Sequence, residues 1–172
     1  MATKPANSKK IYDCIITNPT YFADNVLRAT ENEIGYKVCY YRNQDGVAVP
    51  VIIKLQILKN AWRTVYGNPF LELYSKHRCD IAKVIEFISY YTGKPMAFEG
   101  PAFSFHDPEF SYLKGIIVHP YWRFDFSSTV CGSGIHYFKH KKSALIYADV
   151  LCRTRHNAKI RKNAYKPKEA LF

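Results

Sequence analysis

The sequence lacks an apolar run of the roughly 18 residues that a helix needs to cross a bilayer. Its first ten residues, MATKPANSKK, are basic but are not followed by the uninterrupted apolar stretch of a secretory signal. Its five cysteines form no C-x-x-C pair, and an odd number of thiols cannot all pair with one another. We therefore expect free thiols in a reducing compartment, no secretion and no transmembrane segment.

The sequence also has no internal repeat and no recognised catalytic or nucleic-acid-binding motif. Its 172 residues, of which 48% are apolar, suffice for one ordinary hydrophobic core. We therefore expect a single globular domain that has no cofactor, no metal and no enzymatic activity. Aromatic residues make up 16% of the chain, a surplus that favours contact surfaces over a merely tyrosine-rich core.

Positive charge is concentrated at the two ends of the chain. Of the formal net charge of +11, residues 1–10 contribute +3 and residues 153–172 contribute +6, which leaves fifteen basic and thirteen acidic residues between them. We therefore divide the chain into a basic N-terminal arm (1–10), a domain (11–152) and a basic C-terminal arm (153–172). Such arms contact nucleic acid or acidic protein surfaces, and a solvated, disordered tail is the alternative.

The C-terminal arm is too polar, and too broken by Pro167, to form a stable helix alone. We expect it to become ordered on binding and to run along neighbouring proteins, with an apolar anchor at its end. The arm residues expected to bind a partner are Lys9, Lys10, Arg153, Arg155, Lys159, Arg161, Lys162, Lys166, Lys168, Leu171 and Phe172.

The clearest local pattern is a β-hairpin. Residues 35–42 read GYKVCYYR, residues 47–58 read VAVPVIIKLQIL, and Asp45-Gly46 between them forms a turn readily. Pro50 marks an edge or a bulge, because proline cannot donate to a ladder. The alternation of the second run predicts that four of its residues share the buried face: Val51, Ile53, Leu55 and Ile57.

The remaining elements are read from shorter patterns. Residues 59–78 predict a long excursion with a short helix, and residues 92–110, interrupted by three prolines, predict a loop. Strands are expected over residues 111–119 and 135–138. Residues 79–91 fit two elements: Ile81, Val84, Ile85 and Ile88 match a helical face, but the β-branched and aromatic content favours a strand. A helix is expected over residues 141–151, with Ala144, Leu145, Ala148 and Leu151 on its inner side. The fold class is therefore α+β, with a small, mostly antiparallel sheet and one or two short helices.

The block CGSGIHYF at residues 131–138 gathers a cysteine, two glycines and a histidine. We interpret Cys131, Gly132, Gly134 and His136 as a structural turn that leads into a strand. The glycines permit positive φ, and Cys131 serves as a small buried apolar residue. Alternation then places His136 and Phe138 on one face of the strand and Ile135 and Tyr137 on the other.

Two chemical alternatives exist for this block. Cys131 acting as a nucleophile needs an imidazole such as His136 beside it, and strand geometry permits that arrangement without specifying it. A zinc site would combine Cys131, His136 and His140 with a distant ligand from residue 77 or 79, but zinc sites usually show a closely spaced pair at each end. His106-Asp107-Pro108 is interpreted as an Asx turn before a strand and not as a catalytic dyad.

The order of four segments resembles that of an uncharacterised domain. These segments are IIKLQI at 52, KHRCDIAKVIEF at 76, FSFHDPEFSYLKG at 103 and CGSGIHYFKHKKSALIYA at 131. The similar domain accompanies pentapeptide-repeat proteins of giant viruses and tailed phages, and it has no assigned catalytic residues. The similarity covers about residues 33–150 and leaves out both arms, and this chain lacks the pentapeptide repeats. The resemblance implies a compact β-rich domain from a large DNA virus or phage.

The arms, the aromatic surplus, the missing catalytic motif and the resemblance together predict a structural component of a virus particle. The specific hypothesis is a minor capsid protein that bridges other capsid proteins, both major and minor, and is assembled in the host cell. The alternative is a viral nucleic-acid-binding protein that acts through its basic arms. A Cys/His enzyme is the least favoured interpretation.

Overall fold

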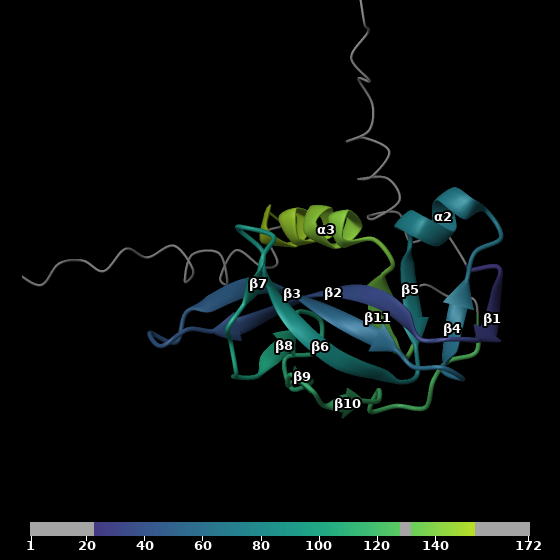
Figure 1. The fold of residues 1–172 in the computed structure, drawn as a ribbon, viewed down its shortest axis with the longest axis horizontal. Helices are drawn as coiled ribbons and strands as arrows, with labels where there is room; N and C mark the ends of the chain where they lie inside the picture. The colour runs from purple at the N-terminus through teal and green to yellow at the C-terminus, as the bar shows by residue number, and fades with distance from the viewer. Residues whose placement is uncertain (1–22, 128–131, 154–172) are drawn as a thin grey trace, which may run out of the picture.

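A long antiparallel hairpin forms the centre of the fold (Figure 1). The computed structural model describes residues 23–127 and 132–153. Within them β2 (Glu33–Arg42) pairs with β3 (Ala48–Ile57) along its whole length. The side-chain oxygen of Asn43 accepts from the N–H of Val47 at 2.8 Å, and Gly46 has φ +75°. The predicted hairpin is confirmed, and the side chain of Asn43 stabilises its turn by this hydrogen bond.

The sheet extends from this hairpin in both directions, and all its described pairings are antiparallel. The main path runs β1 (Asn25–Arg28), β4 (Trp62–Val65), β5 (Lys76–Cys79), β11 (Ile135–Phe138), β2, β3, β6 (Ala82–Ser89) and β10 (Ile117–Val118). Off this path, β7 (Pro95–Met96) pairs with β6, and β8 (Ala102–Ser104) pairs with β2 and with β9 (Ser111–Tyr112). The described part of the chain thus forms an 11-stranded sheet, so the prediction of a small sheet was wrong.

Both faces of the central strands are buried. Val51, Ile53, Leu55 and Ile57 of β3 share one face, as predicted, and belong to a fully buried cluster. Ile52 points to the opposite face, where it packs in a second cluster beneath α3 (Lys141–Arg153). A strand covered on both sides needs apolar residues at most of its positions, which explains the run of four apolar residues from Pro50 to Ile53.

Helix α3 covers one face of the sheet over β2 and β3 (Figure 1). Ala144, Ala148 and Leu151 are buried against the strands, and Leu145 is partly buried against the same cluster. The small alanine side chains let the helix approach the sheet closely. The predicted helix and its inner side are therefore confirmed.

The predictions for the connecting segments were partly wrong. Residues 59–78 contain two strands besides the expected short helix, α2 (Pro69–Tyr74). Asn68 caps this helix, because its side-chain oxygen accepts from the N–H of Phe70 and Leu71. Residues 92–110 contain β7 and β8, and residues 111–119 form two strands instead of one. The strand β1 lies in a region for which no element was expected. Strands of two to four residues are too short to show an alternating pattern.

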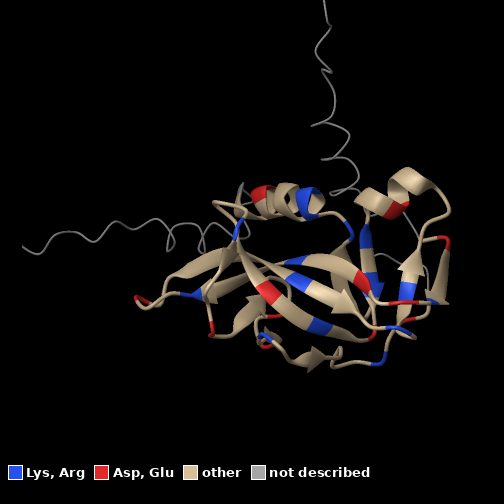
Figure 2. Cartoon of the chain, viewed as in Figure 1, with Lys and Arg blue, Asp and Glu red and all other residues tan. Residues whose placement is uncertain are grey.

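Acidic and basic side chains are interspersed over the described residues (Figure 2), in keeping with the near-neutral body expected from the sequence. The basic arms over residues 1–10 and 153–172 lie outside the described residues, except that Arg153 ends α3. No helix within residues 23–127 and 132–153 is long and apolar enough to cross a membrane.

Gly35 tests the packing between the hairpin and β11. A Cβ atom at this position would overlap the ring of Tyr137 and lie 3.0 Å from Cδ1 of Ile57. Because both neighbours are buried, we expect Gly35→Ala to lower the free energy of unfolding by about 1–3 kcal/mol in urea denaturation. The exposed control Glu31→Ala should stay within about 0.5 kcal/mol of the wild type. Equal stability of Gly35→Ala and the wild type would contradict the close contact.

Candidate functional site

One edge of β2 is shared by two different strands, and a gap lies between them. β11 pairs with β2 at Tyr36, and β8 pairs with β2 from Cys39 to Tyr41. Among the described pairings, Lys37 and Val38 have no cross-strand partner on this side. We call this opening between β11 and β8 the fork.

Lys37 occupies the fork with its side chain almost fully buried, at 8% exposure. Its Nζ donates to the carbonyl oxygen of His136 on β11 at 3.2 Å and lies 5.7 Å from the centre of the Tyr112 ring. No carboxylate of the described residues forms an ion pair with it. Burial lowers the pKa of Lys37, because it disfavours the ammonium form, and the nearby Lys76 acts in the same direction. Cys39, Cys79 and Asp107 oppose the change but do not cancel it.

A cavity of about 260 Å³ lies on the side of the fork that faces α3, and we call it the helix-side cavity. Apolar residues from β2, β11 and α3 form part of its wall, and the remaining side chains are basic, imidazole or phenol groups. Its lining is Lys37, Val38, Lys76, His106, His136, Phe138, Tyr147 and Leu151. No carboxylate belongs to this lining, so the polar side chains that the described residues contribute to the wall are neutral or positive.

A chain of hydrogen bonds crosses the helix-side cavity. Nζ of Lys76 on β5 donates to the hydroxyl of Tyr147 at 3.0 Å and lies 4.3 Å from the centre of that ring. The same hydroxyl lies 2.9 Å from Nε2 of His106. Because an ammonium can only donate, the hydroxyl proton of Tyr147 remains available to donate to Nε2 of His106 in the tautomer that leaves this nitrogen unprotonated. The chain connects β5, α3 and the loop after β8.

A second cavity of about 370 Å³ adjoins the first and is called the loop-side cavity. The two have three lining residues in common, Lys37, His106 and His136. The remaining wall comes from the β8–β9 region, the loop after β10 and the turn before β11: Ser104, Asp107, Phe110, Tyr112, Pro120, Tyr121, Trp122, Gly132, Ser133, Gly134 and Ile135. Asp107 is the one carboxylate in the described lining, so the loop-side cavity is less positive than the helix-side cavity.

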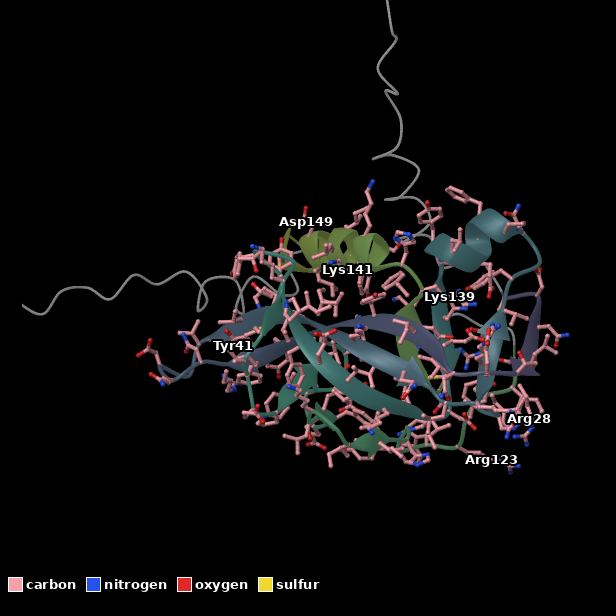
Figure 3. All side chains as sticks on the ribbon, viewed as in Figure 1. Arg28, Tyr41, Arg123, Lys139, Lys141 and Asp149 are labelled. Carbon is pink, nitrogen blue, oxygen red and sulfur yellow. The ribbon has the colours of Figure 1, made fainter. Side chains whose placement is uncertain are left out.

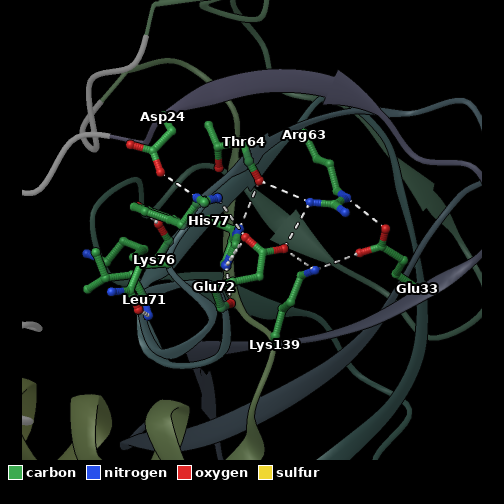
Figure 4. Close-up of polar contacts among 12 residues, drawn as sticks. Asp24, Glu33, Arg63, Thr64, Leu71, Glu72, Lys76, His77 and Lys139 are labelled. Atoms are coloured by element: carbon green, nitrogen blue, oxygen red, sulfur yellow. Dashed lines mark hydrogen bonds and ion pairs between the residues drawn. The ribbon is translucent and has the colours of Figure 1, made fainter.

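A separate group of charged side chains lies beside the site and is internally neutralised (Figure 4). Arg63 on β4 contacts Glu33 at 2.7 Å and Glu72 on α2 at 3.2 Å, while Lys139 contacts both carboxylates. Burial alone would raise the pKa of Glu72, but its bonds with Lys139 and the N–H of Tyr66 lower it overall. These contacts hold α2, β2, β4 and the end of β11 together, so we assign them a structural role.

His77 belongs to this structural group. Its Nδ1 and Nε2 lie 2.9 and 2.7 Å from the carbonyl oxygens of Thr64 and Glu72. Burial lowers the pKa of His77, although the two carbonyls and the Glu72 carboxylate oppose the change. Since both ring nitrogens face carbonyl oxygens, His77 is not placed to bind a metal. Within the described ranges, no three His, Cys, Asp or Glu side chains gather in a group that could hold a metal ion.

The turn before β11 is built around the buried guanidinium of Arg78. This group donates to the carbonyl oxygens of Asp125, Ser127 and Ser133 at 2.9, 2.7 and 2.9 Å. Gly132 is required by close approach, because a Cβ atom there would lie 2.7 Å from Nη1 of Arg78. Its φ is not in the positive range expected from the sequence, whereas Gly134 has φ +153°.

Cys131 and His136, the other two residues of the predicted turn, do not lie in the described turn itself. Cys131 lies outside the described residues. His136 lies within β11 and lines both cavities. The predicted alternation along β11 is confirmed, since Ile135 and Tyr137 belong to one buried cluster and Phe138 to the other.

The other cysteines and histidines considered for chemistry have structural surroundings. Burial raises the pKa of Cys39 to about 12 and raises that of Cys79 as well, so both are thiols and not thiolates near neutral pH. The ring of His140 packs against Tyr74 at a centroid distance of 5.7 Å. Asp107 does form the predicted turn, since its side chain accepts from the N–H of Glu109 at 3.3 Å.

The lysines of the site were missed by the sequence analysis, although one signal was available. In GYKVCYYR, alternation places Lys37 on the same face as Gly35, Cys39 and Tyr41, which is the face directed into the core. A lysine on the apolar face of a strand is unusual and indicates a special role. Lys76 and Tyr147 offered no such signal, because they meet only through the pairing of β5 with β11.

Arg78 is the residue on which the turn should depend. Replacing it by methionine leaves three carbonyl oxygens without their donor, so we expect Arg78→Met to lose about 3 kcal/mol or more of stability. Urea denaturation measures the loss. The matched control is Arg123→Met, since Arg123 is exposed and lies at the periphery of the molecule (Figure 3). A similar small loss in both variants would show that the Arg78 contacts contribute little.

Comparison with known proteins places the chain in a family. No curated protein and no solved structure matches it. A family model described as a family of unknown function, DUF5758, matches residues 20–144. This range contains both long strands, the Arg78 turn, β11 and the start of α3, and the match confirms the resemblance to an uncharacterised domain. The chain therefore belongs to the DUF5758 family of unknown function.

Proposed function

We propose that the protein binds a small organic anion in the helix-side cavity. The observation that carries this proposal is the composition of the cavity wall, in which two lysines and two histidines accompany apolar side chains and no carboxylate is present among the described residues. Ligand sites typically combine a mainly apolar wall with a few placed polar groups. The wall therefore suits a ligand with an apolar body and a carboxylate or phosphate group.

Lys76 supplies the fixed positive charge in this proposal. Its ammonium is oriented by the hydroxyl and the ring of Tyr147, so it is placed before the ligand arrives. A half-buried ammonium attracts an anion more strongly than an exposed one, because the surrounding dielectric constant is lower than in water. The cavity volume of about 260 Å³ is just below the usual range of about 300–1,000 Å³ for ligand pockets, which favours a ligand of roughly the size of benzoate.

Binding of benzoate and of its neutral isostere benzamide tests the proposal. We expect benzoate to raise the thermal unfolding midpoint of the protein and benzamide to leave it nearly unchanged, because only benzoate carries the charge that Lys76 recognises. Stabilisation should reach about 2.7 kcal/mol when benzoate is a hundred times its dissociation constant. Added salt should weaken the effect through screening.

Two lysine variants locate the effect. Lys76→Met should lose the response to benzoate, while the exposed control Lys59→Met should keep it. Equal responses to benzoate and benzamide would contradict an anion site, and an unchanged response in Lys76→Met would place the anion elsewhere. Phenyl phosphate, used in the same way, shows whether a dianion is preferred.

A second function is favoured by a different observation, an exposed apolar surface between β9 and the turn before β11. We call it the 113–126 patch, and it consists of Leu113, Ile116, Ile117, Tyr121, Trp122 and Phe126. Trp122 is 80% exposed and Tyr121 is 65% exposed, which is uncommon for such large side chains. Several large apolar side chains exposed within one short segment favour contact with another protein.

The occupant proposed for the 113–126 patch is a neighbouring protein of a virus particle. Its support is the patch, the basic arms and the resemblance to a viral domain, which together favour a minor capsid protein of a large DNA virus that acts in the virion. The nucleic-acid alternative rests on the basic arms alone. It requires a DNA affinity that falls steeply with salt, so the absence of a gel shift at low salt would exclude it.

Mass spectrometry of purified virus particles tests the particle hypothesis. We expect the chain to be present, and we expect the double variant Trp122→Ser, Phe126→Ser to be incorporated several-fold less because it loses the aromatic contacts. The double variant Lys59→Ser, Lys94→Ser, which changes exposed residues outside the 113–126 patch, is the control and should be incorporated normally. Absence of the wild-type chain from particles would overturn the hypothesis.

A further inference from the structure

Two buried or half-buried lysines line the helix-side cavity, but their surroundings differ. Lys76 is held as an ammonium by the Tyr147 ring and hydroxyl. Lys37 is deeper, donates to one backbone carbonyl and forms no ion pair with a described carboxylate. Burying an ammonium without a counter-ion is costly, so Lys37 gives up its proton more readily than an exposed lysine does.

A neutral lysine amine in a ligand cavity is a nucleophile toward carbonyl carbon. One N–H of such an amine can donate to the His136 carbonyl while the nitrogen lone pair remains available to a ligand. Lys37 lines both cavities, so a ligand on either side of the fork can approach it. His106, whose ring lies 2.9 Å from the Tyr147 hydroxyl, lines the same cavities and belongs to a hydrogen-bonded chain that can supply or take up a proton.

We infer that Lys37 forms an imine with a small anionic aldehyde or ketone bound in the helix-side cavity. The inference rests on the proposed function, because the same cavity and the same Lys76 charge hold the ligand. It adds the class of ligand, an oxo compound that also carries a carboxylate or phosphate, and it adds a covalent step.

The step balances without an oxidant or a reductant. The lone pair of Lys37 Nζ forms a bond to the carbonyl carbon, and the π electrons of the C=O bond move to oxygen, which takes up a proton from the Tyr147–His106 chain. The nitrogen loses a proton and gives a neutral carbinolamine. Protonation of its hydroxyl then releases water as the C=N bond forms, and loss of the last N–H proton gives the neutral imine. The net change is one amine plus one carbonyl to one imine plus one water.

Reductive trapping with 4-formylbenzoate tests the inference, because this probe adds an aldehyde to the benzoate used above. The full chain is incubated with 4-formylbenzoate and cyanoborohydride near neutral pH, and labelled lysines are located by peptide mass spectrometry. Each labelled lysine gains the mass of the aldehyde less one oxygen atom. We expect Lys37 to be labelled before the exposed lysines, by about tenfold for each unit by which its pKa lies below the ordinary value for lysine.

Three controls sharpen the result. Benzoate should slow the labelling of Lys37 by competition, and benzaldehyde, which lacks the carboxylate, should label Lys37 more slowly. Lys37→Arg keeps a long basic side chain but cannot form the imine, so this variant should lose the selective label, and Lys37→Met serves if the arginine does not fit. Labelling of Lys37 should fall as the pH is lowered through its own pKa, since protonation removes the lone pair.

The outcomes separate this inference from the proposed function. Stabilisation by benzoate without selective labelling of Lys37 would overturn the imine and leave the anion site intact. No stabilisation together with equal labelling of all lysines would overturn both. Selective labelling of Lys37 that benzaldehyde matches and benzoate does not slow would support the amine assignment and overturn the requirement for an anion.

Discussion

The division of one edge of β2 between β11 and β8 is the constraint on which the rest of the site depends. A continuous partner strand would have closed this edge and filled the space with cross-strand pairs. The pairing of β2 with β11 ends at Tyr36, and its pairing with β8 begins at Cys39. The two positions of β2 between them therefore face an opening and not a neighbouring strand. The cavities, the buried amine of Lys37 and the convergence of β5, α3 and the loop after β8 all follow from this gap.

Polar contacts fix both ends of β11, the strand that forms one side of the fork. The Arg78 guanidinium fixes the turn that leads into β11, and the ion pairs of Glu33, Arg63, Glu72 and Lys139 fix its end. These groups are polar and buried or half-buried, and they contact one another or backbone carbonyls. Lys37 differs from them because its surroundings disfavour its charge, as is typical of a group placed for chemistry and not for stability.

The sequence predicted the parts of the fold that repeat a pattern over many residues. The β2–β3 hairpin follows from alternation and an Asp-Gly turn, and α3 follows from a helical spacing of Ala144, Ala148 and Leu151. The short strands could not be found in this way, because two to four residues contain at most two periods. The functional site could not be found either, since Lys37, Lys76 and His106 are far apart in the chain and meet only through strand order. Lys37 alone carried a local signal, a lysine on the core-facing side of a strand.

Helix α3 forms part of the cavity wall and is also the last element of the described chain. Tyr147 and Leu151 line the cavity, and two residues later Arg153 begins the most basic part of the sequence. A ligand that shifts the helix against the sheet, and a partner that holds residues beyond it, therefore act on a common element. If the ligand and the partner each favour one position of the helix, thermodynamic linkage requires each to change the affinity of the other by the same factor. A small molecule in the cavity would in this way report its presence to whatever the basic end of the chain holds.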